Sequence, residues 1–379
     1  MAITLNTPTS YIMFSSACRQ LEFATDCASL LFVIKEKETT IVYQTHLNAY
    51  KGIATIFDVR SILEPYMRAN NLSYTSFDIY CKDSTDTGGV SAIDHIKRLS
   101  IVYSYHAIPY NAENFIATRF LTTLTTHRTY PHCTEILPLL TGGSSTSGSI
   151  NVNAYCAYLS AGEHKTATIT LASYSDMAIE HVPLYISYDW LIAKLRFQNI
   201  IVDKILAYTI LFGDRSHTFY VHETSPKLSF TFKNSFNVWE TIRFSTVTVA
   251  KTNVERSFSI SGGQILFYDQ RTNKTYEATT SPLSQDESRW VEEFFISRDV
   301  RLGDISTTID YSDQSLSYSD PTSLPKVLIS ESSCEISDSN SELNRVKFTW
   351  RFADERPHAE HLLIGPDRIH SEQFTYQYN

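Results

Sequence analysis

The feature that most constrains the fold is a recurrence of short apolar runs separated by turn residues. Runs of about five to eight residues between turn residues are typical of β-strands. The chain is rich in Thr and Ser and has 23 Tyr and 21 Phe, and Thr, Tyr and Phe suit a pleated, half-buried surface. Strands do not alternate with helices, which disfavours a doubly wound sheet. The pattern predicts a mainly β protein with two or three sandwich- or barrel-like domains and a few short helices.

Length and composition suggest where these domains divide. The 379 residues are enough for two or three domains. The segment 141–149 is a flexible linker by composition and is the clearest boundary candidate. We predict an N-terminal β-rich domain over 1–135, a middle β-rich domain over 136–225 after a Gly/Ser linker, and a C-terminal β domain over 226–379.

One short helix is predicted in the N-terminal domain, at about 58–69. Apolar residues there follow helical spacing, and Asp58 is placed to cap the first turn. Pro65 lies inside this pattern and should kink or shorten the helix. The apolar runs Asn114–Thr122, Ala193–Phe197 and Phe236–Val249 are instead predicted to be strands.

The C-terminal domain has the clearest local signals. Ser284 and Glu287 form a capping box ahead of a helix predicted at about 285–296, in which Trp290, Val291, Phe294 and Phe295 supply the apolar face. Gly262-Gly263 and Thr272-Asn273-Lys274 are predicted to be hairpin turns. Residues 303–325 are polar, and we expect a long loop that becomes ordered only against a neighbouring subunit.

Charge and patterning exclude several classes of protein. The net charge of −9 and the lack of a Lys/Arg-rich run disfavour a dedicated nucleic-acid binder. The same charge is compatible with an acidic channel wall that DNA slides past without binding. The first residues lack a basic segment followed by an apolar one, so we expect neither a secretory signal nor membrane insertion. The six scattered cysteines are expected to be mostly buried free thiols.

Each motif that could bind a metal is better interpreted as an ordinary structural feature of the chain. His358 and His361 lack the further ligands of a zinc site, so we interpret them as surface histidines. Asp338, Asn340 and Glu342 begin like a calcium loop, but Leu343 stands where such a loop needs glycine, and a polar hairpin turn is the better interpretation. We therefore predict no catalytic, cofactor-binding or metal-binding residues, no cofactor and no enzymatic activity.

The four tryptophans bear on a different class of function, carbohydrate binding. Exposed tryptophan rings serve as stacking platforms for sugars, but these four lie in apolar periodic segments. We therefore interpret Trp190, Trp239, Trp290 and Trp350 as core residues.

Several segments together resemble a known group of proteins. They are 50–67, 235–241, 251–258, 276–300 and 329–354, the last including Val346-Lys-Phe-Thr-Trp-Arg-Phe-Ala-Asp354. They are similar to uncharacterised virion and tail structural proteins of Bacteroidetes phages and prophages, including crAss-like phages. The resemblance implies a tail, ring or baseplate component located in the virion and assembled in the bacterial cytoplasm.

The function expected from the sequence is therefore structural. The expected partners are copies of the chain in a symmetric ring, other virion proteins, and phage DNA in passive contact within a channel. Rings form through head-to-tail contacts that close by rotation, and strand edges and long loops are suitable material for them. One alternative is a carbohydrate-binding or host-adhesion module of the tail. A less favoured one is a hydrolase embedded in the tail, which would need clustered polar residues with perturbed pKa values.

Overall fold

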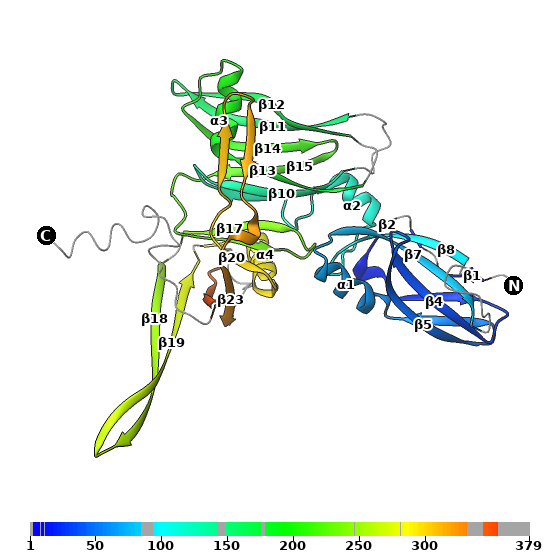
Figure 1. Cartoon of the computed structure of the whole chain (residues 1–379). Helices are drawn as coiled ribbons and strands as arrows, with labels where there is room; N and C mark the ends of the chain where they lie inside the picture. The colour runs from blue at the N-terminus through cyan, green and yellow to red at the C-terminus, as the bar shows by residue number, and fades with distance from the viewer. Residues whose placement is uncertain are drawn as a thin grey trace.

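The computed structural model describes residues 3–7, 9–10, 12–84, 94–141, 149–175, 179–245, 247–280, 282–331 and 344–354. Within them the chain is mainly β, as predicted, and its sheets form sandwich-like and half-barrel-like layers. Figure 1 shows an N-terminal sheet on one side, a middle region above, and a C-terminal region from which one long hairpin projects.

The N-terminal region is an eight-stranded sheet that curves around its own core. Phe23 and Phe32 come from different parts of the sheet, yet their ring centroids lie 5.6 Å apart. Helix α1 (Val59–Ala69) adds Leu63 and Met67 to this core. The strands, in their order across the sheet, are β1 (Thr4–Leu5), β3 (Gln20–Ala24), β6 (Ile53–Phe57), β5 (Thr40–Tyr50), β4 (Ser29–Glu36), β7 (Tyr74–Asp83), β8 (Asp94–Val102) and β2 (Ile12–Phe14), with the 3-10 turn η1 (Ser15–Ala17) after β2.

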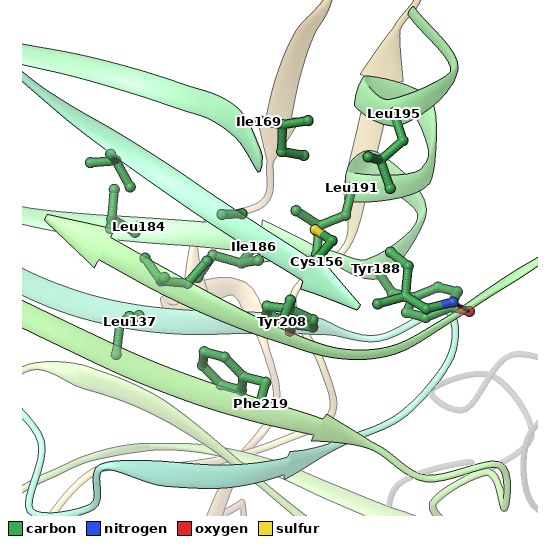
Figure 2. Close-up of a cluster of buried hydrophobic side chains, with 14 of the residues drawn as sticks. Leu137, Cys156, Ile169, Leu184, Ile186, Tyr188, Leu191, Leu195, Tyr208 and Phe219 are labelled. Carbon is green, nitrogen blue, oxygen red and sulfur yellow. Dashed lines mark hydrogen bonds between the residues drawn. The ribbon is translucent and has the colours of Figure 1, made fainter. Parts of the chain in front are cut away.

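The middle region is a sandwich of a five-stranded and a two-stranded sheet. Leu137 and Ile186 from the small sheet face Cys156, Tyr208 and Phe219 from the large one (Figure 2). Helix α3 (Tyr188–Phe197) covers one end of this core. The strands are β12 (Glu163–Ser175), β11 (Ser149–Ser160), β14 (Lys204–Phe212), β15 (Arg215–Val221) and β9 (Thr126–Thr129) in the large sheet, and β10 (Thr134–Leu140) and β13 (His181–Ser187) in the small one.

The C-terminal region is a seven-stranded sheet with helix α4 (Gln285–Ile296) packed on one face. Its core is aromatic: Phe230, Phe232, Phe244 and Phe348 each lie near Phe294 of α4, with ring centroids 5.1–5.9 Å apart. The strands, in order, are β17 (Trp239–Phe244), β16 (Leu228–Lys233), β20 (Val300–Leu302), β23 (Lys326–Glu331), β24 (Lys347–Phe352), β19 (Gln264–Thr279) and β18 (Val247–Ser261).

A further buried cluster joins the three regions. Phe14 of the N-terminal sheet, Phe115 of helix α2 (Ala112–Thr118) and Phe236 before β17 pack together, with ring centroids 5.4–6.4 Å apart. Leu140 of β10 belongs to the same cluster. The expected division at 135–136 falls inside β10, and the three-domain division remains a prediction.

The capping box of α4 is confirmed, whereas the expected cap of α1 is wrong. Ser284 Oγ accepts from Glu287 N at 3.3 Å, and Ser284 N donates to Glu287 Oε2 at 2.8 Å. Asp58 precedes α1 but makes no side-chain cap, because its backbone is left-handed, with φ at 50°. The amides of Val59 and Arg60 donate instead to the carbonyls of Arg19 and Cys18. The helix also continues past Pro65 to Ala69, held by its buried face.

Two expected strands are partly or wholly helices. Asn114–Thr122 overlaps α2, which ends at Thr118 and is capped by Asn111, whose Oδ1 accepts from Glu113 N at 2.8 Å. Ala193–Phe197 is the second half of α3, which has Asp189 in its first turn and Lys194 in its last, as the helix dipole favours. Both helices are short, and short apolar runs do not separate helix from strand.

The expected strand Phe236–Val249 is interrupted. Asn234 Oδ1 accepts from Phe236 N at 2.9 Å, and Asn237 has a positive φ of 59°. These residues form a turn, because Asn tolerates left-handed backbone and bonds its own main chain two residues on. Strand β17 begins only at Trp239, and β18 begins at Val247.

Two further expectations in the C-terminal region need correction. Thr272-Asn273-Lys274 is not a turn: β19 runs straight through it, because β18 pairs along its length and Asn253 pairs with Asn273. The segment 303–325 is not one loop, since it forms the hairpin β21 (Thr307–Asp310) and β22 (Ser315–Tyr318) and the 3-10 turn η3 (Pro321–Ser323). This hairpin packs on the middle region of the same chain, where Tyr318 stacks on Tyr185 at 3.6 Å between ring centroids.

Candidate functional sites: a polar junction and a projecting hairpin

The largest group of buried ionisable residues lies where the middle and C-terminal regions meet. His127 of β9 and His217 of β15 are both buried, with Nδ1 of the first 2.6 Å from Nε2 of the second. Glu240 of β17 lies 3.3 Å from His127. Thr122 donates to Glu240 at 2.6 Å, and the Asn234 side-chain amide donates to the other carboxylate oxygen at 3.0 Å. The junction thus links three strands and a turn.

The surroundings of His217 favour its neutral form. Burial and the neighbouring His127 hold the pKa of His217 well below its usual value. A neutral imidazole donates through one nitrogen and accepts through the other, which is what a hydrogen bond between two rings requires. In the described part of the chain, no group of three or more His, Cys, Asp or Glu side chains has the geometry to hold a metal ion.

Helix α4 contributes a second carboxyl to the junction. Glu293 is buried and accepts from Ser235 N at 2.8 Å. Burial, and then the charge of Glu240, raise the pKa of Glu293 to about 7. A carboxyl with this pKa exchanges a proton near neutral pH. Catalytic acid–base groups have this property, and so do carboxyls buried beside another carboxylate for structural reasons.

A buried ion-pair group completes the junction on its other side. Arg243 of β17 pairs with Glu135 of β10 and, at 3.0 Å, with Asp304. Thr129 and Thr241 donate to the two oxygens of Glu135 at 2.5 and 2.6 Å. Burial alone would raise the pKa of Glu135, but the charge of Arg243 and these hydrogen bonds lower it, so the carboxylate stays ionised.

A pocket of about 380 Å³ opens beside the histidines. It is lined by His217, Arg119 and a set of hydroxyl side chains that includes Thr122 and Ser216. The hydroxyl of Thr122 donates to a carboxylate, not to a histidine. Across the described ranges, no hydroxyl or thiol is hydrogen-bonded to a histidine ring nitrogen. The contacts present therefore hold two sheets together and do not assemble a nucleophile beside a base.

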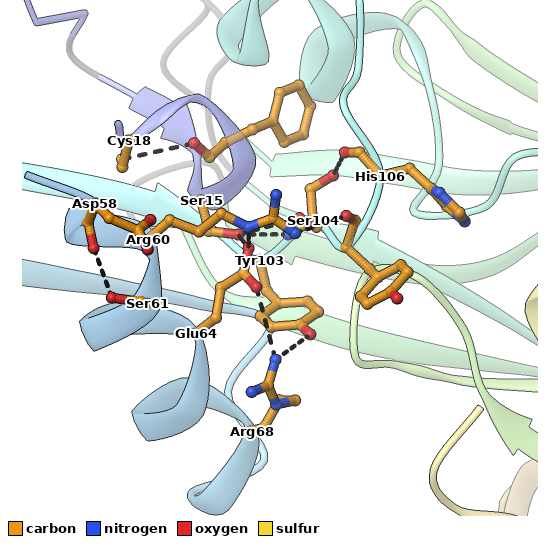
Figure 3. A network of polar contacts seen from close by, with 12 residues as sticks. Ser15, Cys18, Asp58, Arg60, Ser61, Glu64, Arg68, Tyr103, Ser104 and His106 are labelled. Atoms are coloured by element: carbon orange, nitrogen blue, oxygen red, sulfur yellow. Dashed lines mark hydrogen bonds and ion pairs between the residues drawn. The ribbon is translucent and has the colours of Figure 1, made fainter. Parts of the chain in front are cut away.

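A third polar network, in the N-terminal region, fixes α1. Glu64 accepts from Ser15 Oγ at 2.9 Å and from Arg60 Nε at 2.8 Å, and Arg68 lies 3.6 Å from it (Figure 3). Burial and the charge of Glu64 raise the pKa of the nearby Cys18 thiol to about 12. Such a thiol is not a nucleophile at neutral pH.

The most exposed feature is the hairpin β18–β19, which leaves the body of the protein in Figure 1. The pairing runs from Val247–Thr279 at the base to Ser261–Gln264 at the tip, where Gly262 and Gly263 both have positive φ, as the sequence predicts for a tight turn. Strand β24 pairs only with the base of β19, at Tyr276–Thr279. Beyond the base, both edges of the hairpin carry no neighbouring strand among the described residues.

The tip of this hairpin is apolar on one face. Phe258 pairs with Phe267 and Ile260 pairs with Ile265, so all four side chains lie on the same face. Their exposed fractions are between 61% and 73%. We call these four residues the tip cluster. On β18 the opposite face carries Glu255, Ser257 and Ser259.

The other residues singled out in the sequence have clear outcomes. Trp190, Trp290 and Trp350 are buried, as predicted, and Trp239 is partly buried beneath the Lys233 ammonium. The five described cysteines are buried thiols. Residues 142–148, 338–342, His358 and His361, and Cys334, lie outside the described ranges. No helix among those described is long and apolar enough to cross a membrane. The junction was missed, because its members are scattered between residues 122 and 304.

Comparison with known proteins gives no family. No family model and no curated protein matches the chain. Among solved structures, the calcium-binding domain CBD12 of CALX1.1 is 10% identical, with a TM-score of 0.18 over 56% of this chain and 79% of that one. Alpha-2-macroglobulin of E. coli is 7% identical, with a TM-score of 0.18 over 74% and 21%. The plexin A4 extracellular region is 8% identical, with a TM-score of 0.20 over 94% and 40%. Such low scores support no inference about this chain.

Proposed function

We propose that this protein is a structural component of a phage virion, of the tail, ring or baseplate type, and that it assembles into a symmetric ring. The observation that carries the proposal is the β18–β19 hairpin. A two-stranded ribbon alone in water is only marginally stable. This ribbon has open edges and an exposed tip cluster, so a contact with another protein would stabilise it.

The rest of the molecule is consistent with a rigid assembly subunit. The three regions are joined by the aromatic cluster around Phe115 and by the buried ion pairs of Arg243. Rigid joints let a subunit place a projecting arm at a defined distance and angle from its neighbour. The net charge of −9 suits a wall that phage DNA passes without binding. The resemblance of segments such as 50–67 to virion proteins points the same way.

The direct test is the state of the purified protein in solution. Mass photometry, paired with electron microscopy of the same sample, would be run on the full chain alone and with neighbouring virion proteins. We expect ring-shaped particles of uniform mass. A chain that stays monomeric under every condition would contradict the proposal.

A second candidate, a carbohydrate-binding tail module, is favoured by one observation. Tyr311 and Tyr318 on the β21–β22 hairpin are exposed, and they lie beside Phe197 and Tyr185. Exposed aromatic rings are suited to stacking on sugar rings. A glycan array probed with the full chain and with Tyr311→Ala tests this function: binding lost in the variant supports it, and no binding by either contradicts it.

A further inference from the structure

We propose that the tip cluster of one copy docks onto an exposed apolar patch of the N-terminal sheet in a second copy. This inference rests on the proposed function, because it names the contact through which copies would join. The partner of the tip cluster is a second copy of this chain.

The receiving surface is made by the β5–β6 hairpin. Tyr50 pairs with Ile53, and Phe57 lies on the same face of β6, because side chains alternate along a strand. Their exposed fractions are 75%, 41% and 71%, whereas Ala54 and Ile56 point into the core. We call Tyr50, Ile53 and Phe57 the sheet patch. Three large apolar side chains grouped on one exposed sheet face are typical of an interaction surface.

The two surfaces match in chemistry. The tip cluster is flanked by Arg256, whose guanidinium lies over the Phe267 ring at 5.7 Å from its centroid. Along β6 the sheet patch is flanked by Glu22, which pairs with Thr55 between Ile53 and Phe57 and so lies on the same face. At the turn end of the patch the Lys51 ammonium lies over the Tyr50 ring, 5.3 Å from its centroid, so the anionic side of the patch is the Glu22 side. An apolar contact with one cation on one side and one anion on the other gives both attraction and orientation.

The positions of the two surfaces explain why a second copy is needed. The β18–β19 hairpin and the N-terminal sheet that contains β5 extend to opposite sides of the molecule in Figure 1, so one chain does not bring the two surfaces together. A contact between different surfaces of identical subunits is head-to-tail, and repeating it produces a closed ring or an open filament. Pairing of hairpin edges between copies is the competing arrangement.

Photo-crosslinking distinguishes these arrangements. A benzoylphenylalanine replacing Phe267 would be activated in particles assembled from equal amounts of ¹⁵N-labelled and unlabelled full-length chain, so that crosslinks between copies are recognised by mass. We expect crosslinks between copies to fall in the peptide containing Tyr50, Ile53 and Phe57. Crosslinks to residues 247–279 of another copy would overturn the docking site but leave ring assembly standing. Absence of any oligomer would overturn both.

A charge exchange provides an independent test. Arg256→Glu and Glu22→Arg should each weaken self-association about tenfold, because each places like charges together at the contact. The double variant should regain most of the lost affinity, as measured by sedimentation velocity. Val249→Ser, on the opposite face of the same hairpin, is the matched control and should assemble normally. Additive loss in the double variant would contradict the pairing, and circular dichroism would confirm that each variant is folded.

Discussion

At the scale of single residues, Arg243 is the side chain on which the junction most depends. Its side chain is 2% exposed, and those of its partners Glu135 and Asp304 are 4% and 9% exposed, so little solvent surrounds this group. Removing one partner of a buried ion pair typically costs about 3–5 kcal/mol, because the remaining charge is left uncompensated. We therefore expect Arg243→Met to lower the free energy of unfolding by that amount, measured by urea denaturation followed by near-ultraviolet circular dichroism.

An exposed ion pair provides the control for Arg243. Lys204 and Glu223 pair on the surface of the middle region. Surface pairs contribute about 0–1 kcal/mol, so Lys204→Met should change the unfolding midpoint little. Equal effects of the two substitutions would show that the Arg243 group is not the anchor described above.

Glu293 predicts how stability depends on pH. Its pKa is raised in the folded protein to about 7, from an ordinary value near 4.5. The folded state therefore holds this proton more tightly than the unfolded chain does, and stability due to this group falls as pH rises from 4.5 to 7. Glu293→Gln removes the ionised form, so the variant should match the wild type at pH 5 and exceed it at pH 8. The gain should be on the order of 3 kcal/mol.

Thermal denaturation at pH 5 and pH 8 measures this difference. The neighbouring Glu292 is exposed on the same helix, so Glu292→Gln is the control and should show no such pH dependence. His217 titrates in the opposite sense, since its pKa is lowered, but it is present in both proteins and cancels in the comparison. A Glu293→Gln variant less stable at pH 8 than the wild type would contradict the prediction.

At the scale of elements, the β21–β22 hairpin is held by the chain's own middle region. Tyr318 stacks on Tyr185, and the hydroxyls of Thr307 and Thr134 lie 3.2 Å apart. Because an aromatic pair contributes about 0.5–1.5 kcal/mol beyond its buried area, Tyr318→Ser should open the hairpin several-fold more often. We expect a nonspecific protease to cut near residues 311–314 several-fold faster in the variant.

The same experiment shows whether the β21–β22 hairpin is held by its own chain or becomes ordered only against a neighbouring subunit. Tyr220→Ser replaces an exposed tyrosine on β15 and should leave cleavage near 311–314 unchanged. Cleavage of wild-type monomer as fast as that of the Tyr318→Ser variant would show that the hairpin is not held by the middle region.

The elements that could be predicted from the sequence are those with strong local signals. The α4 capping box and the Gly262-Gly263 turn each need only neighbouring residues, and both were predicted correctly. Helices α2 and α3 were missed, because their short apolar runs suit a strand equally well. The turn predicted at Thr272-Asn273-Lys274 was wrong, because pairing with β18 overrides its local preference.

The two candidate sites differ in how well they can be predicted from the sequence. Phe258, Ile260, Ile265 and Phe267 alternate with other residues around two glycines, and this local pattern is enough to place all four on one face of a hairpin. The junction had no such signal. His127 and His217 are far apart in the chain, and Glu135 meets Arg243 only after two sheets pack together. A site made by packing is invisible to spacing along the chain.

At the scale of the whole molecule, the proposed assembly depends on the distal part of the hairpin, whereas the sheet core pairs only with its base. Residues 256–270 would be replaced by Asn-Gly, joining the paired residues Glu255 and Arg271 through a two-residue turn. The base of β19 keeps its pairing with β24 at Tyr276–Thr279, so the sheet and its aromatic core are unchanged. We expect the shortened chain to melt at the wild-type temperature yet remain monomeric.

The two measurements must be read together. Thermal denaturation reports on the cores, and mass photometry reports on assembly. A lower melting temperature would mean that the distal ribbon supports the subunit itself, and loss of assembly would then be uninformative about docking. If the shortened chain melts at the wild-type temperature and still forms rings, the copies join through another surface and not through the tip cluster. A stable monomer is the outcome that assigns the hairpin to the contact between subunits.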